Sequence, residues 1–469
     1  MIFKKKMISV FFAGILSLSL FASSLGQVYG EESYHDKYAR ATIVSDLKTG
    51  RIIYEKNSNK QYAMASMSKI MTLLLTFDAI RDKKVNLGDI VQIKKEDVNR
   101  EGTNMKLDAG DRIPLHDLMK GMMIISANDA ALAIARYVGG STNEFVKMMN
   151  NKAKEIGMNN TIFYNPNGLP YKIDKNGNST ENTTTASDVL TLSKWIYEHY
   201  PNELTKITSL KRFVFKPKNI DEENTNPLLP IMSNVDGLKT GFTDKAGYCL
   251  SYMMKTFKDK NNDVENRIFG VTMGSPTKED RKESAYTALN YIGKYYSTKV
   301  LYDPNSMIKR VNINNFGYED YALENKKPIV VIKKNTEYMK PVYIYNRVEL
   351  WNMFDRPLAS LYFYDQNGIM IAKDELYLQR PSEMDLKQRL FLFVSILKAS
   401  IFNDNNTKNS PIVSLDMNKL KNMVKYYIED SYVYKKVKTM KNYVLNIYNE
   451  WVEKVKGWII CLKTVQMIW

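Results

Sequence analysis

The chain has 469 residues, 44% of them hydrophobic and 25% charged, and it carries a formal net charge of +16. This length allows two or three domains, each with a core of its own. Two distant cysteines and three scattered histidines cannot form a disulfide scaffold or a cluster of metal ligands, so we expect neither a metal nor another cofactor.

Residues 1–30 have the pattern of a signal peptide. Three lysines at 4–6 precede an apolar stretch over 7–25, and 28–30 offer tolerated residues before a cleavage point near Glu31. The apolar stretch leaves an uncleaved membrane anchor open as the alternative, and in either case the remaining chain lies outside the cytoplasm. An exported basic protein suits anionic lipid and wall polymers, so we do not expect nucleic acid as a partner.

Residues 31–298 form the expected catalytic domain, which begins with two strand-like segments, 40–46 and 50–55. A helix is expected at 66–81, where apolar residues recur at helical spacing. Ser66 and Lys69 are three apart in its first turn and therefore share one face. A buried lysine with a lowered pKa can take the proton of a serine hydroxyl and make it a nucleophile. The alternative is that Ser66 merely caps a core helix.

A second motif, Ser126-Ala-Asn128, precedes an alanine-rich segment that ends at two glycines. We expect helices at 114–125, at 127–138 and, after a Ser141–Glu144 capping box, at 142–156. Ser126 and Asn128 could simply cap the middle helix. In the catalytic interpretation, Ser126 passes a proton to the leaving group and Asn128 holds the substrate backbone.

The third motif, Lys239-Thr240-Gly241, lies within 235–254, which we expect to form strands, as we do 267–273. A glycine on a strand lets another backbone approach, so a peptide substrate could pair along such an edge. Lys239 and Thr240 would then offer a cation and a hydroxyl to a terminal carboxylate. A glycine-rich turn is the alternative. In this order, however, the three motifs supply a nucleophile, amine bases and a carboxylate anchor.

The order of the elements predicts an α+β fold. Strands are followed by a block of helices, then by strands again and by a last helix over 278–296, which favours an antiparallel sheet packed against helices. The chain has only three histidines, His35, His116 and His199, and none has a nucleophile-like context. A Ser-His-Asp triad is therefore not expected.

These motifs resemble those of the low-molecular-mass penicillin-binding proteins, specifically the serine D-alanyl-D-alanine carboxypeptidases. The resemblance runs from about Ala41 to about Tyr296 and includes the residues around each motif, with Asn165-Pro-Asn-Gly-Leu169 as a further signature. It implies a β-lactamase-like and penicillin-binding-protein-like antiparallel sheet flanked by helices, with a helical subdomain and the site at their junction.

The resemblance also implies a role for each matching residue. The catalytic residues would be Ser66, which the penultimate D-alanine carbonyl acylates, Lys69 as the base, and Ser126. The substrate would be bound by Asn128, Lys239, Thr240, Gly241, Phe242 and Arg281, with backbone N–H groups of Ser66 and Phe242 as the oxyanion hole. A solvated charge at a helix start explains Arg281 nearly as well. Phe242 departs from the histidine that close relatives often have, and Cys249 is expected in the core, with a reactive thiol as the alternative.

Two further regions follow the catalytic domain. Residues 299–385 contain several strand-like runs, two of them separated by Asn367-Gly368, and predict a small β-rich domain. Residues 386–469 form a tail in which one apolar helical stripe runs from Val433 to Leu462 with lysines between its members. Such a basic amphipathic helix is typical of a membrane surface, and packing against the β-rich domain or a partner is the alternative.

We therefore expect an exported enzyme at the membrane or in the cell wall that removes the terminal D-alanine from peptidoglycan stem pentapeptides. β-Lactam antibiotics such as penicillins would acylate and inhibit it. A D,D-endopeptidase or a β-lactamase of the same fold is the enzymatic alternative, but the Ser-Ala-Asn motif and the lack of a clear glutamate near 165–170 disfavour a β-lactamase. The non-enzymatic alternative is an inert wall-binding scaffold, against which the intact motifs argue.

Overall fold

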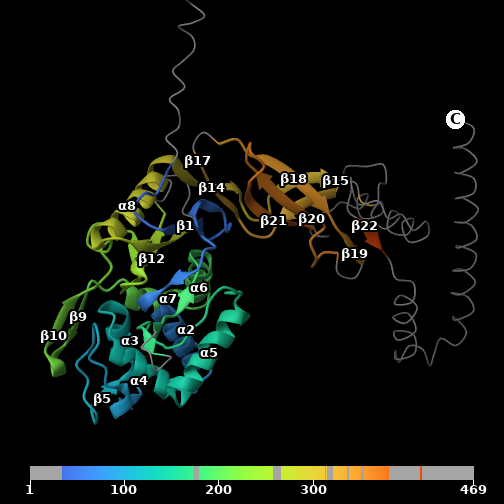
Figure 1. The fold of residues 1–469 in the computed structure, drawn as a ribbon. Helices are drawn as coiled ribbons and strands as arrows, with labels where there is room; N and C mark the ends of the chain where they lie inside the picture. Colours follow the sequence, from blue (N-terminus) through green and yellow to red (C-terminus); the bar gives the residue numbers. More distant parts are fainter. Residues whose placement is uncertain are drawn as a thin grey trace, which may run out of the picture. The chain divides into compact units, whose positions relative to one another are not determined.

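The computed structural model describes residues 34–172, 179–256, 266–311, 313, 321–334, 337–349, 353–379 and 412–414. The chain forms two compact units (Figure 1). The first runs to Val300 and also takes Val330–Tyr338, which the sequence analysis grouped with the β-rich domain; the second comprises Leu301–Ile329 and the described residues from Met339 onward. The predicted signal peptide and nearly all of the predicted tail lie outside the described residues.

The first unit is built on a five-stranded antiparallel sheet in the order β11-β12-β13-β1-β2. Its strands come from both ends of the unit: β1 (Ala41–Asp46), β2 (Ile52–Lys56), β11 (Val235–Thr243), β12 (Gly247–Lys255) and β13 (Arg267–Ser275). Every residue of β1 and β13 is buried, because helices cover both faces of the sheet. β11 is an edge strand, so one row of its backbone groups has no partner strand.

Helices form the rest of this unit. They are α2 (Lys69–Arg81), α3 (Leu115–Ile124), α4 (Asn128–Gly139), α5 (Thr142–Glu155), α6 (Ala186–His199), α7 (Pro201–Thr208) and α8 (Lys278–Tyr295), with a 3₁₀ turn η1 (Ala65–Ser68) leading into α2. α6 packs on β13 and β1, and α8 packs on β13 and β12. The predicted helices at 66–81, 114–125, 127–138, 142–156 and 278–296 are thus confirmed to within a few residues, whereas α6 and α7 had no counterpart among the expected elements.

α2 is buried on every side rather than along one stripe. All its residues from Lys69 to Ala79 are buried. A helix that is apolar all round belongs in the middle of a core, where neighbouring helices enclose it. α4, α5, α3 and α6 all contact α2. Its first residue therefore carries an amine into the interior of the protein.

Short two-stranded pieces complete the first unit. Residues Val330–Tyr338 are held to it by an ion pair, since Arg51 Nη1 lies 2.8 Å from the Glu337 carboxylate and both side chains are buried. The short pairs are β3 (Tyr62–Ala63) with β8 (Thr183–Thr184), β4 (Ile90–Gln92) with β5 (Arg112–Pro114), β6 (Tyr171–Lys172) with β7 (Ser179–Thr180), β9 (Arg212–Phe215) with β10 (Ile220–Glu223), and β14 (Tyr296–Tyr302) with β17 (Ile329–Lys334).

The second unit is β-rich over its described residues. Its five-stranded sheet has the order β15-β16-β21-β20-β18, from β15 (Met307–Val311), β16 (Tyr321–Asn325), β18 (Lys340–Tyr345), β20 (Ala359–Tyr364) and β21 (Met370–Leu378). β19 (Arg347–Glu349) pairs in parallel with β22 (Ile412–Ser414). Gly368 has a positive φ of 78° in the turn between β20 and β21, which is where Asn367-Gly368 predicts a hairpin.

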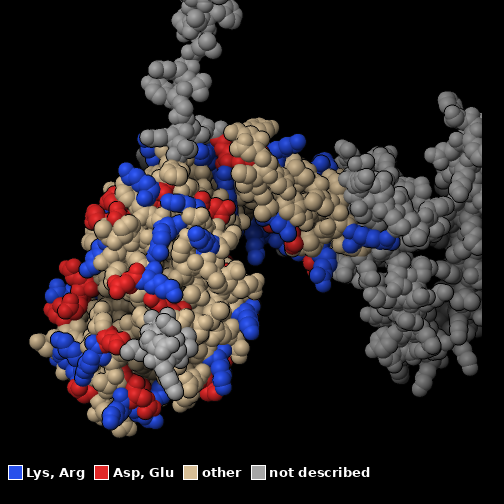
Figure 2. Space-filling model, viewed as in Figure 1, with Lys and Arg blue, Asp and Glu red and all other residues tan. Residues whose placement is uncertain are grey.

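The described part of the chain shows neither a large basic patch on the visible face of the first unit (Figure 2) nor a membrane-spanning helix. On the visible face of the first unit, basic and acidic side chains are interspersed rather than gathered into one basic patch (Figure 2). Within the described ranges, the structure has no helix long and apolar enough to cross a bilayer. The stripe from Val433 to Leu462 lies outside those ranges and stays a prediction.

Candidate active site

The Ser66 and Lys69 side chains meet where η1 runs into α2. Lys69 Nζ lies 2.7 Å from Ser66 Oγ, as the spacing of the motif predicts. Ser66 is half-buried, whereas Lys69 has no exposed surface. A hydroxyl that substrate can reach is therefore in contact with an amine that water cannot reach.

The structure does not support capping as the role of the first two motifs. No side chain caps η1 or α2. α4 begins at Asn128 after Ala127 and also has no side-chain cap. In contrast, Ser141 accepts a hydrogen bond from Glu144 N at the start of α5, as the capping box predicts. The polar residues of the two motifs are thus free for other contacts.

Lys69 has three oxygen neighbours and no ion-pair partner among the described residues. Its Nζ is 2.7 Å from Ser66 Oγ, 2.7 Å from Asn128 Oδ1 and 2.7 Å from the Asn167 carbonyl oxygen. Burial lowers the pKa of Lys69 well below its usual value, and the positive charge of Lys239 lowers it further, although Asp129 opposes these effects. The site therefore favours the neutral amine.

Asn128 is fixed by the loop that precedes β5. Its Nδ2 donates to the Glu101 carbonyl at 2.9 Å and its backbone N–H to the Thr103 carbonyl at 2.8 Å. The buried Asp129 carboxylate accepts from the Met105 and Leu107 backbone N–H groups. These contacts explain why Asn128 Oδ1, and not its amide nitrogen, is turned toward Lys69.

Two glycines let other segments press against the backbone of Ser66. A Cβ on Gly241 would lie 3.1 Å from Ser66 N, and a Cβ on Gly168 would lie 2.0 Å from the Ala65 carbonyl oxygen. Gly168 also has a positive φ of 84°, which other residues rarely adopt. Side chains at these positions would displace the turn that carries the nucleophile.

β11 brings the third motif beside the first. Lys239 is buried, and its Nζ donates to the Thr240 carbonyl at 2.9 Å. Burial, followed by the nearby Arg281 charge, lowers the pKa of Lys239 to about 7. Thr240 Oγ1 donates to Thr225 Oγ1 at 2.7 Å. Lys69 and Lys239 are therefore two buried amines near each other, and a positive charge on Lys239 disfavours protonation of Lys69.

Phe242, Tyr248 and Arg281 form a short stack beside this motif. Phe242 is 48% exposed, and its ring stacks on Tyr248 with centroids 4.2 Å apart. The Arg281 guanidinium lies 5.8 Å from the Tyr248 ring centre. Arg281 is buried near the start of α8, so it is not the solvated charge of the alternative interpretation. Among the described residues, nothing accepts a hydrogen bond from its Nε.

Ser126 is placed differently from the other motif residues. It has a positive φ of 67° and is half-buried in the turn between α3 and α4. Within the described part of the chain, no group hydrogen-bonds to its side chain, so the structure does not join Ser126 to the contacts around Lys69. Its hydroxyl remains available to a ligand.

The Asn167 carbonyl and the Thr225 hydroxyl were missed as site groups in the sequence. A backbone carbonyl carries no side-chain signal, although the 165–169 signature pointed to the right segment. Asn182 was also missed, and it holds that segment in place: its Nδ2 donates to Ser68 Oγ at 2.8 Å and to the Asn165 carbonyl at 2.9 Å.

The histidines and the described cysteine take no part in this site. His199 stacks on Trp195 at 4.3 Å, and His116 Nε2 lies 3.2 Å from Asp117 Oδ1. Cys249 is buried, and burial raises the pKa of its thiol to about 11, which fits a core residue rather than a reactive thiolate. The described residues also contain no cluster of side chains able to hold a metal ion.

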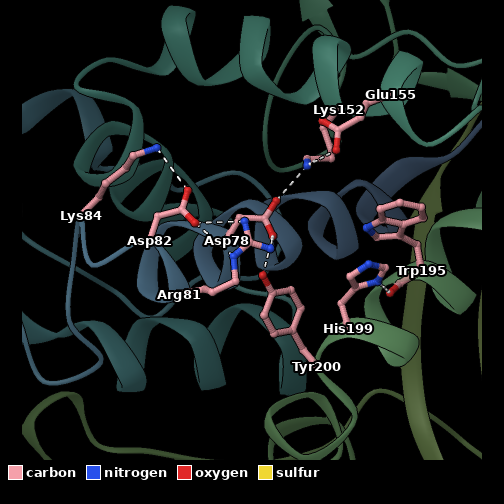
Figure 3. Close-up of polar contacts among 9 residues, drawn as sticks. All are labelled: Asp78, Arg81, Asp82, Lys84, Lys152, Glu155, Trp195, His199 and Tyr200. Atoms are coloured by element: carbon pink, nitrogen blue, oxygen red, sulfur yellow. Dashed lines mark hydrogen bonds and ion pairs between the residues drawn. The ribbon is translucent and has the colours of Figure 1, made fainter. Parts of the chain in front are cut away.

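The other end of α2 holds a second buried charge (Figure 3). Asp78 Oδ1 accepts from the Tyr200 hydroxyl at 2.5 Å, and Asp78 Oδ2 lies 3.1 Å from Lys152 Nζ. Arg81 adds a longer contact of 3.4 Å. Burial and the Asp78 hydrogen bond raise the pKa of Tyr200, so it stays a donor. These contacts tie α2 to α5 and to the start of α7.

Comparison with known proteins defines the class of this site. The family model described as D-alanyl-D-alanine carboxypeptidase matches residues 29–277. The chain belongs to this family, and it is a serine-type carboxypeptidase with a penicillin-binding-protein fold.

Individual relatives carry this activity or a related one in their names. D-alanyl-D-alanine carboxypeptidase DacF of Bacillus subtilis is 31% identical over 345 residues, which are 72% of this chain and 84% of that protein. A D-alanyl-D-alanine endopeptidase of Pseudomonas aeruginosa is 30% identical over 45% of this chain and 65% of its own length. Penicillin binding protein 5 of Haemophilus influenzae has a similar structure, with a TM-score of 0.61, 25% identity, and coverage of 74% of this chain and 98% of its own.

Proposed function

We propose that Ser66 attacks the carbonyl of the penultimate D-alanine of a peptidoglycan stem pentapeptide, releases the terminal D-alanine and forms an acyl-enzyme that water then hydrolyses. The observation that carries this proposal is the 2.7 Å contact between Ser66 Oγ and the buried Lys69 amine. A general base must lie within hydrogen-bond reach of the proton that it removes, and this one does.

The neighbours of Lys69 suit a free amine. A neutral amine has two N–H donors and one lone pair. Asn128 Oδ1 and the Asn167 carbonyl can accept the two donors, which leaves the lone pair for the Ser66 hydroxyl proton. With no carboxylate paired to it in the described structure and a pKa lowered by burial, Lys69 can accept this proton near neutral pH.

The edge of β11 offers a place for the substrate backbone. A peptide that pairs with this strand would pass Gly241, whose missing side chain leaves the strand close to Ser66 N. In the proposed complex, the Ser66 and Phe242 N–H groups hold the oxyanion. The terminal carboxylate would be bound by Lys239 and Thr240, with Arg281 behind them. Asn128 would hold the substrate backbone, and Ser126 would pass a proton to the leaving amine.

β-Lactams would follow the same route as far as the acyl-enzyme. A penicillin also presents a carbonyl next to a carboxylate, so Ser66 would open its ring and remain acylated. The name of the similar Haemophilus influenzae protein records penicillin binding for that protein. In this chain, no carboxylate hydrogen-bonds to Ser66 or Lys69 within the described residues, and Glu181 is engaged by Thr243 Oγ1. Lys69 would activate the water that hydrolyses the peptide acyl-enzyme, but the described site has no carboxylate to assist this step at a β-lactam-derived acyl-enzyme, which favours slow release over β-lactamase turnover.

The proposal also includes where the enzyme works. Residues 1–30 would direct export, 31–298 would form the catalytic domain, 299–385 the β-rich domain, and 386–469 the segment that associates with the membrane surface. Peptidoglycan is an extracytoplasmic substrate, so this arrangement would place the enzyme next to it. The net charge of +16 favours association with anionic surfaces.

The test is D-alanine release from a soluble peptide that ends in Lys-D-Ala-D-Ala, with the mature protein and Ser66→Ala compared. We expect release by the parent protein and a loss of about 10⁴-fold or more in the variant. Equal thermal unfolding of the two proteins would show that the variant is folded. Release that persists in Ser66→Ala would place the nucleophile elsewhere.

A D,D-endopeptidase is the second candidate, favoured by the relative that bears that name. Crosslinked dimers of stem peptides present a related bond, which the same Ser66 could attack. Incubation of the enzyme with pentapeptide monomers and with crosslinked dimers would separate the two activities. Cleavage of dimers with pentapeptides left intact would overturn the carboxypeptidase proposal and keep the acyl-enzyme.

A further inference from the structure

The second unit has an outward sheet face that combines tyrosine, aliphatic and lysine side chains. Along β20, Leu361 and Phe363 are buried, whereas Tyr362 and Tyr364 between and beyond them are half-buried and point to the other side of the sheet. We call this the tyrosine face, and it consists of Lys340, Val342, Ile344, Tyr362, Tyr364 and Lys373.

Strand register places these side chains next to one another. Tyr362 lies opposite Val342 on β18 and opposite Lys373 on β21, and Tyr364 lies opposite Lys340. Directly opposed residues of an antiparallel pair share one face of the sheet. The six side chains therefore form one continuous surface across three strands, with the β18 edge at its margin.

The two tyrosine rings are neighbours on this face with nearly parallel planes, and we call this pair the platform. Their centroids are 6.2 Å apart and their planes differ by 21°. Lys373 Nζ lies 5.5 Å from the Tyr362 ring centre. Ile344 is 52% exposed at the edge strand. An apolar platform with ammonium groups beside it can hold a ligand that has flat apolar faces and negative charges.

Charge around the platform is mostly positive. Lys340 and Lys373 are exposed on the face itself. On β21, Asp374 points to the other side of the sheet, whereas Glu375 lies opposite Ser360 on the side of the platform. Glu375 accepts a hydrogen bond from Tyr377 at 3.1 Å, and Lys326 lies 4.0 Å from the Tyr377 ring centre. Among the described residues of β18, β20 and β21, this side of the sheet thus carries one carboxylate, which already accepts a hydrogen bond, against two lysines that can meet an anionic ligand.

We propose that the tyrosine face binds the glycan strand of peptidoglycan, with sugar rings stacked on Tyr362 and Tyr364 and stem-peptide carboxylates near Lys340 and Lys373. The C–H face of a pyranose ring is apolar and flat, so it matches an aromatic ring better than a polar surface does. This proposal rests on the proposed function, which makes peptidoglycan the substrate. The second unit would then hold the polymer whose stem peptides the first unit trims.

A membrane surface fits this face less well. Insertion between lipid headgroups requires apolar side chains that reach beyond the backbone, as on an amphipathic helix. Tyr362 and Tyr364 instead lie half-buried on a sheet. Aromatic rings held in this way favour contact with the apolar face of a ligand, and the flanking lysines favour a ligand with carboxylates.

The test measures co-sedimentation of the full chain with purified peptidoglycan sacculi, in a Ser66→Ala background so that the polymer is not consumed. The double variant Tyr362→Ala/Tyr364→Ala removes the platform. Tyr338→Ala is the matched control, because Tyr338 is 71% exposed and lies outside the tyrosine face. A second double variant, Lys340→Glu/Lys373→Glu, changes only exposed side chains. It tests the same proposal if the tyrosine variant does not fold.

We expect the tyrosine double variant to bind sacculi about tenfold more weakly, with Tyr338→Ala unchanged. Peptide-free glycan chains should compete with sacculi for the parent protein. The lysine variant should lose more affinity for sacculi with stem peptides than for peptide-free glycan. In the background with Ser66 intact, each variant should release D-alanine from the soluble peptide at the parent rate, because the face does not touch that substrate.

Equal binding of sacculi by the tyrosine variant and the control would overturn the proposal. The proposal would also be overturned if the tyrosine variant lost binding to vesicles of anionic phospholipid but kept its binding to sacculi, because the face would then bind lipid. Absence of D-alanine release by the parent protein would count against the proposed function alone, because sacculus binding is measured without turnover.

Discussion

The two ends of α2 each bury a charged group, and they treat it in opposite ways. At the first end, Lys69 is surrounded by neutral oxygens and faces the like charge of Lys239. At the other end, Asp78 is met by Lys152, by Arg81 and by the Tyr200 hydroxyl (Figure 3). A buried charge that has partners makes the fold sensitive to the loss of any one of them, whereas a buried amine without a counter-charge gives up its proton easily. One helix thus carries the proposed catalytic amine, Lys69, at its first end. At its other end it carries a carboxylate, Asp78, whose contacts fix the helix to its neighbours.

Replacement of Lys69 should have the largest effect. Lys69→Met removes the proposed base, and we expect acylation of Ser66 to slow by about 10³-fold or more. Lys69→Arg should fail as well, because a guanidinium stays protonated at the working pH. Lys152→Met removes an amine from the other end of α2 and should leave the acylation rate of the folded protein nearly unchanged. Acylation of Lys69→Met by a fluorescent penicillin as fast as that of the parent protein would contradict the catalytic role of this end of α2.

Replacement of Asp78 should affect stability rather than chemistry. Asp78→Ala leaves the buried Tyr200 hydroxyl without its acceptor, while Lys152 keeps Glu155 at 2.8 Å, so the free energy of unfolding should fall by about 2 kcal/mol. Denaturant titration measures this change, and Asp82→Ala, on the exposed side of the same turn, should cause no detectable change. A large loss of kcat in folded Asp78→Ala, with stability retained, would contradict the division of roles along α2.

A smaller effect is expected at Lys239 and depends on pH. Because its pKa is lowered to about 7, Lys239 loses its positive charge as the pH rises above that value. Binding of a carboxylate-ended peptide should then weaken, so kcat/KM should fall on the alkaline side through a rise in KM. Lys239→Arg stays charged and should lack this alkaline limb, even if its overall activity is up to about tenfold lower. A parent KM that does not change above pH 7 would show that Lys239 keeps its charge in the free enzyme.

The sequence predicted those parts of the site that side chains and spacing define. Ser66 and Lys69 meet because residues three apart share a helix face, and Lys239 to Phe242 lie on a strand as expected. Local signals could not decide whether Ser126 and Asn128 cap α4, because capping depends on backbone angles at the helix start. The structure shows no side-chain cap there.

Other features depend on tertiary contacts and were therefore missed. The Asn167 carbonyl reaches Lys69 only because Gly168 allows its loop to touch Ala65, and no side chain reports this contact. The spacing of apolar residues predicted a helix at 66–81 but not how much of it is covered, and four helices enclose α2. Whether an apolar helix is half-covered or fully enclosed is decided by its neighbours and not by its own periodicity.

The most direct test of the account is the pH dependence of Ser66 acylation in the parent protein. The first-order rate constant should be measured at saturating fluorescent penicillin, so that a change in binding at Lys239 does not enter. This constant should rise with pH and reach its plateau well below 10.5, the usual pKa of a lysine, since Lys69 is buried without a counter-charge in the described structure. A rate that keeps rising until about pH 10.5 would mean that Lys69 titrates as an ordinary lysine, and would contradict its role as the base near neutral pH.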